Sequence, residues 1–148
     1  MIEKTYFLAN LSELKKVMPW IQEHIAKAGF LQPDIRRIEL AMEEALVNIM
    51  QHAHLSKTDL VELTCAISDT SIEFILKDKG APFNPLTSLP QINSTETLEQ
   101  KKEGGLGLFM IKKFMDELFY ERQEPYNVLH LKKRKSQNAN RKTEEKKT

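Results

Sequence analysis

Apolar positions at helical spacing predict two helices in the first third of the chain. Ser12 is the predicted N-cap of the first, Pro19 is a point where that helix bends or divides, and Gly29 is suited to end it. A second helix is predicted from Pro33 to about Ala53, because proline fits the first helical turn. The apolar stripe of the first helix consists of Leu11, Leu14, Val17, Met18, Ile21 and Ile25.

Alternation of apolar and polar residues predicts strands in three further places. Runs 60–67 and 71–78 both alternate, and the short polar turn 68–70 between them predicts a hairpin. Short strands are also predicted for "KTYFLA" near the N-terminus and for "YNVLHLKK" near the end of the domain. The inward positions of the hairpin are Val61, Leu63, Cys65, Ile67, Ile72, Phe74 and Leu76.

Segment 80–103 shows no sustained period and contains three prolines. Long irregular segments of this kind inside a compact domain are usually functional, and lids are one example. The next segment, "GGLGLFMIKKFMDELFYE", opens on glycines and then follows helical spacing throughout. The order of elements predicts an α+β fold: a two-layer sandwich with a mixed, mostly antiparallel sheet, helices on one face and a flexible lid.

Composition describes an ordinary globular domain. The chain has 148 residues, of which 41% are hydrophobic and 29% charged, and no apolar run approaches the ~20 residues that span a bilayer. The N-terminus has no basic segment followed by an apolar one, so no signal peptide is predicted. The single cysteine, Cys65, excludes an internal disulfide and fits a small buried apolar residue in a reducing cytoplasm.

Charge divides the chain into an acidic body and a basic tail. Eight of the 22 lysines and arginines, but two of the 21 acidic residues, fall in 132–148. We therefore expect a folded domain over 1–132 and a disordered tail over 133–148, because the tail has almost no apolar residue. A solvated tail is the simpler interpretation, and contact with nucleic acid or an acidic partner is the alternative.

The second predicted helix carries a row of polar residues beside its apolar stripe. At roughly 100° per residue, Glu44 and Asn48 lie within about 40° of each other at the edge of that stripe, and His52 lies closer to the core. Glu43 falls on the opposite, solvated side. A carboxylate at this edge can accept a proton, and an amide oxygen suits Mg²⁺. The alternatives are that Glu44 and Asn48 have no function at this edge, and that His52 is a core histidine with its hydrogen bonds satisfied.

Two further clusters carry candidate chemistry. In "DKGAPFNP", Asp78 ends an apolar strand, where its carboxylate can accept a hydrogen bond from an amino group such as that of adenine. Gly80 lets a flat ring approach the backbone. Gly104, Gly105 and Gly107 stand where a helix begins, a position that favours phosphate. A P-loop and a Rossmann fingerprint are absent from the sequence, and nothing in it suggests a zinc site or a Ser-His-Asp triad.

Taken together and in this order, the three clusters resemble the GHKL ATPase superfamily with its Bergerat fold. The greatest similarity is to the bacterial anti-sigma-factor serine kinases. The motifs that carry the resemblance are "EEALVNIMQHAH", "DKGAPFNP" and "EGGLGLFMIKKFMDE", and the resemblance covers roughly residues 5 to 132. Two features depart from the family pattern: Asn84 stands where an acidic residue is common, and "EPYNVLHL" lacks the Gly and Thr usual in the last strand.

The resemblance implies a role for each matching residue. Glu44 would be the general base, Asn48 the Mg²⁺ ligand, Asp78 the carboxylate that reads the adenine amino group, and Gly80 the glycine beneath the ring. The phosphate-side motif would bind the nucleotide as the lid closes, and its residues are Gly104, Gly105, Gly107 and Leu108.

The function that the resemblance implies is partner switching by a cytoplasmic, ATP- and Mg²⁺-dependent protein serine kinase. Such a kinase phosphorylates an anti-sigma-factor antagonist of the STAS type and sequesters a sigma factor, usually as a homodimer, without membrane or direct nucleic-acid contact. The first alternative is a nucleotide-gated binding module that has lost phosphotransfer. The second is an ATP-binding protein that acts on nucleic acid through its tail, with binding that weakens steeply with salt.

Overall fold

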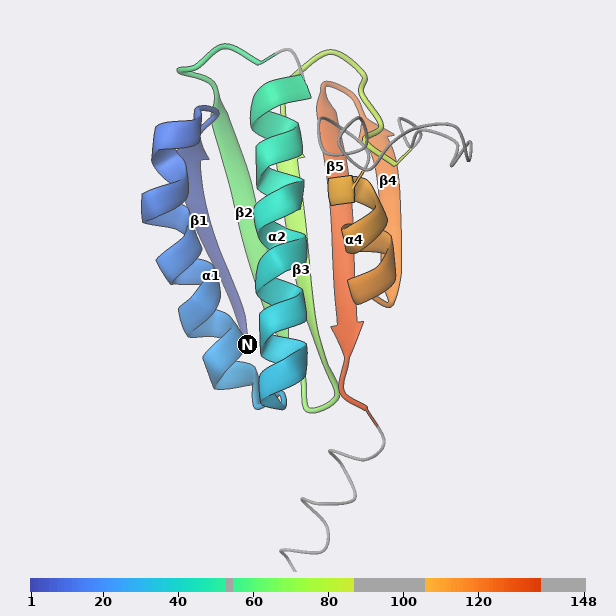
Figure 1. Cartoon of the computed structure of the whole chain (residues 1–148). Coiled ribbons are helices and arrows are strands. Elements are labelled where there is room, and N and C mark those ends of the chain that lie inside the picture. The colour runs from blue at the N-terminus through green and yellow to red at the C-terminus, as the bar shows by residue number, and fades with distance from the viewer. Residues whose placement is uncertain (53–54, 87–105, 137–148) are drawn as a thin grey trace, which may run out of the picture.

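The computed structural model describes residues 1–52, 55–86 and 106–136, and these form two layers (Figure 1). Its helices are a 3₁₀ turn η1 (Leu11–Glu13), α1 (Leu14–Ala28), α2 (Gln32–His52) and α4 (Leu106–Phe114). Its strands are β1 (Ile2–Leu8), β2 (Leu60–Ile67), β3 (Ser71–Asp78), β4 (Glu117–Gln123) and β5 (Tyr126–Arg134). The predicted α+β sandwich is confirmed.

The five strands form one sheet in the order β1-β2-β3-β5-β4. The predicted hairpin is confirmed as β2 and β3, whose register pairs Leu63 with Leu76 and Cys65 with Phe74. All four pairings between these strands are antiparallel, so the described sheet lacks the parallel pair that a mixed sheet would contain. Strand β5 lies between β3 and β4 and joins the edge strand β4 to the rest of the sheet.

The three α-helices lie on one face of the sheet (Figure 1). Alternate residues of the strands point toward them, and α2 packs against both α1 and α4. The interface between the layers is the core, whose most buried large side chains are Phe74, Ile21, Ile25, Ile38, Met42, Leu46, Leu63, Ile72, Leu76 and Leu131. Burial of each such side chain contributes about 1.5–3 kcal/mol relative to exposure, and this fixes the helices on the sheet.

Local signals account for most helix boundaries. Gly29 takes a left-handed conformation at φ 81°, which ends α1 as predicted, and Pro33 lies in the first turn of α2. Pro19 lies inside α1, which continues past it as one helix. The predicted N-cap at Ser12 is wrong, because Ser12 lies within the 3₁₀ turn and Glu13 precedes α1.

The helix predicted across 104–121 is too long. Helix α4 ends at Phe114, and the continuation forms the edge strand β4. The reason is tertiary: the Asp116 backbone N–H donates to the carbonyl of Lys132, and the Asp116 carboxylate accepts from the backbone N–H of Arg134. Pairing with β5 satisfies backbone groups and overrides the local helical spacing.

Two predictions fall largely outside the described part of the chain. The predicted lid, residues 86–103 of the irregular segment, and most of the tail predicted over 133–148 lie there, since 87–105 and 137–148 are not described. Strand β5 itself continues to Arg134. Among the described helices, none is both long and apolar enough to span a membrane.

Candidate functional site

Four elements meet at one end of the sandwich, and the sequence motifs lie there. Helix α2 and strand β3 end at this side of the molecule, while α4 and β5 begin at it (Figure 1). Glu44 and Asn48 lie in the C-terminal half of α2, and Asp78 is the last residue of β3. The fold therefore brings the first two motifs to a common end. Gly107 lies in the first turn of α4.

Glu44 and Asn48 lie one helical turn apart on α2 at the margin of the core. Both are partly buried, whereas the neighbouring Glu43 is exposed, as the helical spacing predicted. Partial burial raises the pKa of the Glu44 carboxyl above its ordinary value, and the charge of Glu43 adds to the effect. No hydrogen bond or ion pair to Glu44 is found among the described residues. A carboxylate in this setting favours a proton more than one in water does.

The side-chain amide of Asn48 is the second feature of this helix edge. Its Nδ2 atom is the one buried side-chain nitrogen or oxygen without a hydrogen-bond partner in the described part of the chain. Buried polar atoms are normally satisfied, so an orphaned amide indicates a place where a ligand or water completes the site. Rotation of the amide exchanges Nδ2 with Oδ1, and this same position can therefore present either a donor or an oxygen ligand.

Asp78 is the last residue of β3 and is 5% exposed. Its Oδ1 atom accepts a hydrogen bond of 2.8 Å from the backbone N–H of Gly80, which forms a tight turn after the strand. Oδ1 also accepts a bond of 3.0 Å from Asn127 Nδ2. No hydrogen bond to Oδ2 is found among the described residues, so this oxygen remains an acceptor.

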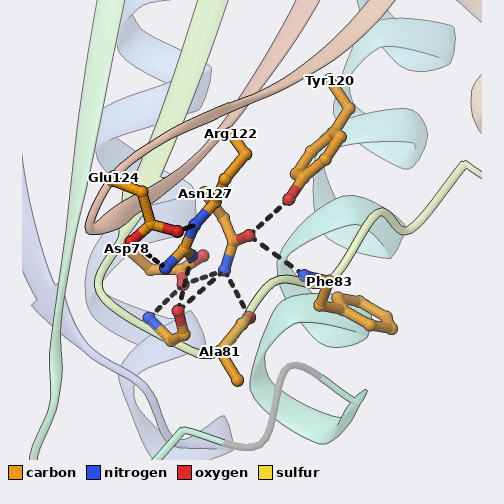
Figure 2. A network of polar contacts seen from close by, with 8 residues as sticks. Asp78, Ala81, Phe83, Tyr120, Arg122, Glu124 and Asn127 are labelled. Atoms are coloured by element: carbon orange, nitrogen blue, oxygen red, sulfur yellow. Dashed lines mark hydrogen bonds and ion pairs between the residues drawn. The ribbon is translucent and has the colours of Figure 1, made fainter.

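Asn127 is the hub of the polar network shown in Figure 2. It lies directly opposite Asp78 in the β3–β5 register and is likewise 5% exposed. Its Oδ1 accepts from the backbone N–H of Phe83 at 3.1 Å and from the Tyr120 hydroxyl at 2.6 Å. Its Nδ2 donates to Asp78 and, at 2.9 Å, to the carbonyl of Ala81. One buried amide thus joins β3, β4, β5 and the loop after β3.

Arg122 on β4 holds the same loop from the other side. Its Nη1 donates to the carbonyl of Gly80 at 2.7 Å, while Nε and Nη2 pair with the Glu124 carboxylate (Figure 2). Gly80 is therefore held through both its N–H and its carbonyl. Hydrogen bonds on both sides of Gly80 therefore fix the turn that would lie beneath a flat ring.

Behind this network lies a small pocket with a largely apolar wall. Its volume is about 10 Å³, which is room for a single water. The polar groups at its rim are already in place, but the space for a larger ligand is not yet open. The pocket is lined by Ile49, Leu76, Asp78, Phe83, Pro85, Tyr120, Asn127 and Leu129. Ile49 is the neighbour of Asn48, which connects this pocket to the edge of α2.

Some predicted site residues lie beyond the part of the chain that the structure describes. Gly104 and Gly105 are among them, and Leu108 and His52 are described only as members of α4 and α2. Residues missed by the sequence prediction are Tyr120, Arg122 and Asn127. Asn127 could have been found, because it shares the inward face of β5 with Leu129 and Leu131 and is polar.

Metal binding at this end of the fold would not rest on a preformed cage. In the described segments no group of three or more His, Cys, Asp or Glu side chains could hold a metal ion. The free amide of Asn48 fits the alternative, a Mg²⁺ ion held by one protein oxygen together with phosphate oxygens and waters.

Comparison with known proteins agrees with this geometry. The family described as "Histidine kinase-like ATPase domain" matches residues 7–133, which include the whole of the candidate site. The chain belongs to this family of histidine kinase-like ATPase domains. The GHKL-type fold expected from the sequence motifs is thereby confirmed.

Serine-protein kinases are among the curated relatives of the chain. The chain is 29% identical to the serine-protein kinase RsbW of Staphylococcus epidermidis over 112 residues, which covers 72% of this chain and 70% of the relative. It is 32% identical to the RsbW of Staphylococcus aureus over 98 residues, or 63% of this chain and 62% of the relative. The resemblance to anti-sigma-factor serine kinases that the motifs indicated is therefore confirmed.

A solved structure supports the fold. The crystal structure of the RsbU and RsbW domains of a Mycobacterium tuberculosis protein superposes with a TM-score of 0.60 at 16% identity. The match covers 89% of this chain, which spans about a third of that longer protein (32%). At this identity the similarity establishes the shared architecture.

Proposed function

We propose that this protein is a cytoplasmic, ATP- and Mg²⁺-dependent protein serine kinase that also acts as an anti-sigma factor. One observation carries the proposal: Glu44 and Asn48 form a half-buried polar pair without partners in the described residues, at the same end of the fold as the buried carboxylate of Asp78. If this helix edge had no function, the side chains of Glu44 and Asn48 would be expected to face water. Similarity to serine-protein kinases supplies the reaction class.

Glu44 is the proposed general base. A base near the core takes the proton of an attacking hydroxyl more readily when its pKa is raised toward neutrality, and burial raises the pKa of this carboxyl. Glu43 is exposed on the other side of the helix, so it provides a matched comparison. The acceptor hydroxyl would belong to a serine of the protein substrate.

Asp78 and Asn48 are proposed to bind the nucleotide. Oδ2 of Asp78 would accept a hydrogen bond from the adenine amino group, while Gly80 lets the ring lie against the backbone. Asn48 would hold Mg²⁺, which neutralises phosphate charge when it is bound. The glycines Gly104, Gly105 and Gly107, together with Leu108, are proposed to contact the phosphates as helix α4 begins.

The proposed partners follow from the family resemblance rather than from the geometry. We infer a STAS-type anti-sigma-factor antagonist as substrate, a sigma factor as the sequestered partner, and a homodimer as the working form. Nucleotide would then set the competition between the two partners, since each binds one state of the protein more tightly.

Phosphotransfer is the direct test. Purified protein is incubated with radiolabelled ATP, Mg²⁺ and the STAS-type proteins of the source cell, and transfer to serine is followed with wild type, Glu44→Gln and Glu43→Gln. Wild type and Glu43→Gln should transfer phosphate, and Glu44→Gln should lose at least about 99% of the rate while still binding ATP. Undiminished transfer by Glu44→Gln would contradict the catalytic assignment.

A nucleotide-gated binding module without phosphotransfer is the second candidate. It predicts ATP binding and nucleotide-dependent capture of a sigma factor by the wild type, with no label on any antagonist. The presence of Glu44 at the helix edge favours the kinase, because a module that only binds has no use for a base there.

A further inference from the structure

We propose that Asn127 determines the purine specificity of the nucleotide site by fixing which oxygen of Asp78 faces the base. This inference rests on the proposed nucleotide site. Asn127 acts through Asp78 and is a positioning residue. Neither the sequence motifs nor the comparisons assign it a role.

The hydrogen bonds of Asn127 leave its amide only one orientation. The Phe83 backbone N–H, which can only donate, and the Tyr120 hydroxyl both donate to Oδ1. The Nδ2 side faces acceptors alone: the Asp78 carboxylate and the carbonyls of Ala81 and, at 3.4 Å, Gly80. Reversal of the amide would place its NH₂ group against the Phe83 N–H and its oxygen against these acceptors.

Every polar group of Asn127 is therefore occupied by the protein. A base that enters the pocket finds neither a free donor nor a free acceptor on this side chain, although Asn127 lines the pocket. What Asn127 can do is fix its neighbour. Together with the Gly80 N–H it anchors Oδ1 of Asp78 with two hydrogen bonds, and Oδ2 is then the oxygen left for a ligand.

A carboxylate oxygen held in this way selects among purines by their 6-substituent. The exocyclic amino group of adenine can donate to Oδ2, whereas the 6-keto oxygen of hypoxanthine or guanine would oppose it. If the carboxylate could turn, water and a rotated oxygen would relieve part of that repulsion. A site that hydrogen-bonds one substituent discriminates against its absence most strongly when its own polar groups are fixed.

The position of Asn127 follows from strand pairing. The β3–β5 register places it opposite Asp78, and the β4–β5 register places Arg122 on its other side. All three side chains project toward the helix-covered face, as residues opposite each other do. The β4–β5 hairpin thus positions the side chains that surround Asp78.

The test is calorimetric titration of the full chain with Mg²⁺-ATP and with Mg²⁺-ITP, which carries a keto group in place of the amino group. Wild type should prefer ATP. Asn127→Ala should weaken ATP by about tenfold and leave ITP nearly unchanged, so that the ATP:ITP preference falls by about tenfold. Tyr120→Phe is the matched control, because it removes a bond to the same amide but keeps both anchors of Asp78 Oδ1.

Asn127→Ser is the second variant should Asn127→Ala not fold, because its smaller side chain leaves room for water to satisfy the loop. It should lower the preference in the same direction. An equal loss of ATP and ITP affinity in these variants would show a purely structural role and overturn the inference. Equal binding of ATP and ITP by the wild type would also overturn it while the nucleotide site stands, whereas absence of any nucleotide binding would overturn the proposed function itself.

Discussion

The carboxylate of Glu3 on β1 lies 2.7 Å from Nε2 of the buried His24 on α1. The other ring nitrogen, Nδ1, lies 2.7 Å from the carbonyl of Trp20, which can only accept. The His24 ring also packs at a tilt against the Trp20 indole, with 3.9 Å between the ring centroids. This pair ties the edge strand to the first helix.

Low pH should weaken the interaction between Glu3 and His24. The hydrogen bond from His24 holds the pKa of Glu3 below its ordinary value, and the nearby charges of His24 and Lys27 lower it further against a smaller opposing effect of burial. A lowered folded-state pKa adds stability above the unfolded value of 4.5, and this gain is lost progressively as pH falls from 4.5 through the folded-state pKa. Melting temperatures at pH 7 and pH 4 should therefore differ less in Glu3→Gln than in wild type. An identical acid loss in both proteins would contradict the linkage, and exposed Glu43→Gln is the control.

Ionised Glu44, the proposed base, should lower the free energy of unfolding. The pKa of Glu44 is raised, chiefly by burial, so its ionised form is disfavoured in the folded state and the penalty appears as pH rises through the folded pKa. Glu44→Gln should raise the melting temperature at pH 8 by about 1–2 °C and change it little at pH 4. Thermal unfolding at both values measures this. A fall at pH 8 would show that the carboxylate stabilises the fold.

Substitution of Asp78 by asparagine should weaken ATP binding by about tenfold or more. The donors Gly80 N–H and Asn127 Nδ2 would hold the new amide oxygen at the Oδ1 position, so its NH₂ group would face the adenine amino group. Two donors would then meet. Asp69→Asn makes the same change in the exposed turn between β2 and β3 and should bind ATP like wild type. Equal affinities in titrations of Asp78→Asn and wild type would remove the base-reading role.

The Mg²⁺ dependence of ATP affinity should distinguish the role of Asn48 from that of Glu44. Asn48→Ala removes the unsatisfied amide on α2, so ATP affinity should fall in Mg²⁺ and change little in EDTA. Glu44→Gln should keep both affinities, because a base acts in the transition state rather than in the bound state. Titrations with and without the metal give the comparison. A loss of equal size in EDTA would assign Asn48 a structural role.

Cys65 should be inert in the native protein. The side chain is fully buried on β2, and burial raises the pKa of its thiol to about 12. Because the thiolate is the reactive form, a thiol reagent at pH 8 should react at least about a hundredfold more slowly with the native chain than with the denatured chain. Rapid modification without unfolding would show that β2 opens locally.

Sequence periodicity alone determined most of the described elements and half of the site. Helical spacing located α1 and α2, alternation located the β2–β3 hairpin, and Gly29 marked a helix end through its own backbone freedom. Glu44, Asn48 and Asp78 were identified because their settings depend on neighbours within a turn of helix or along one strand. These are short-range properties, and residues close in sequence encode them.

Tertiary structure alone decided β4 and the role of Asn127. Local spacing favoured a helix through Glu121, yet residues 117–123 pair with the edge of β5 as strand β4. Asn127 meets Asp78 because strands 49 residues apart in sequence pair in one register. A shift of one residue would turn Asn127 to the opposite face of the sheet. That register is set by the packing of the whole inward face against the helices, which no single segment contains.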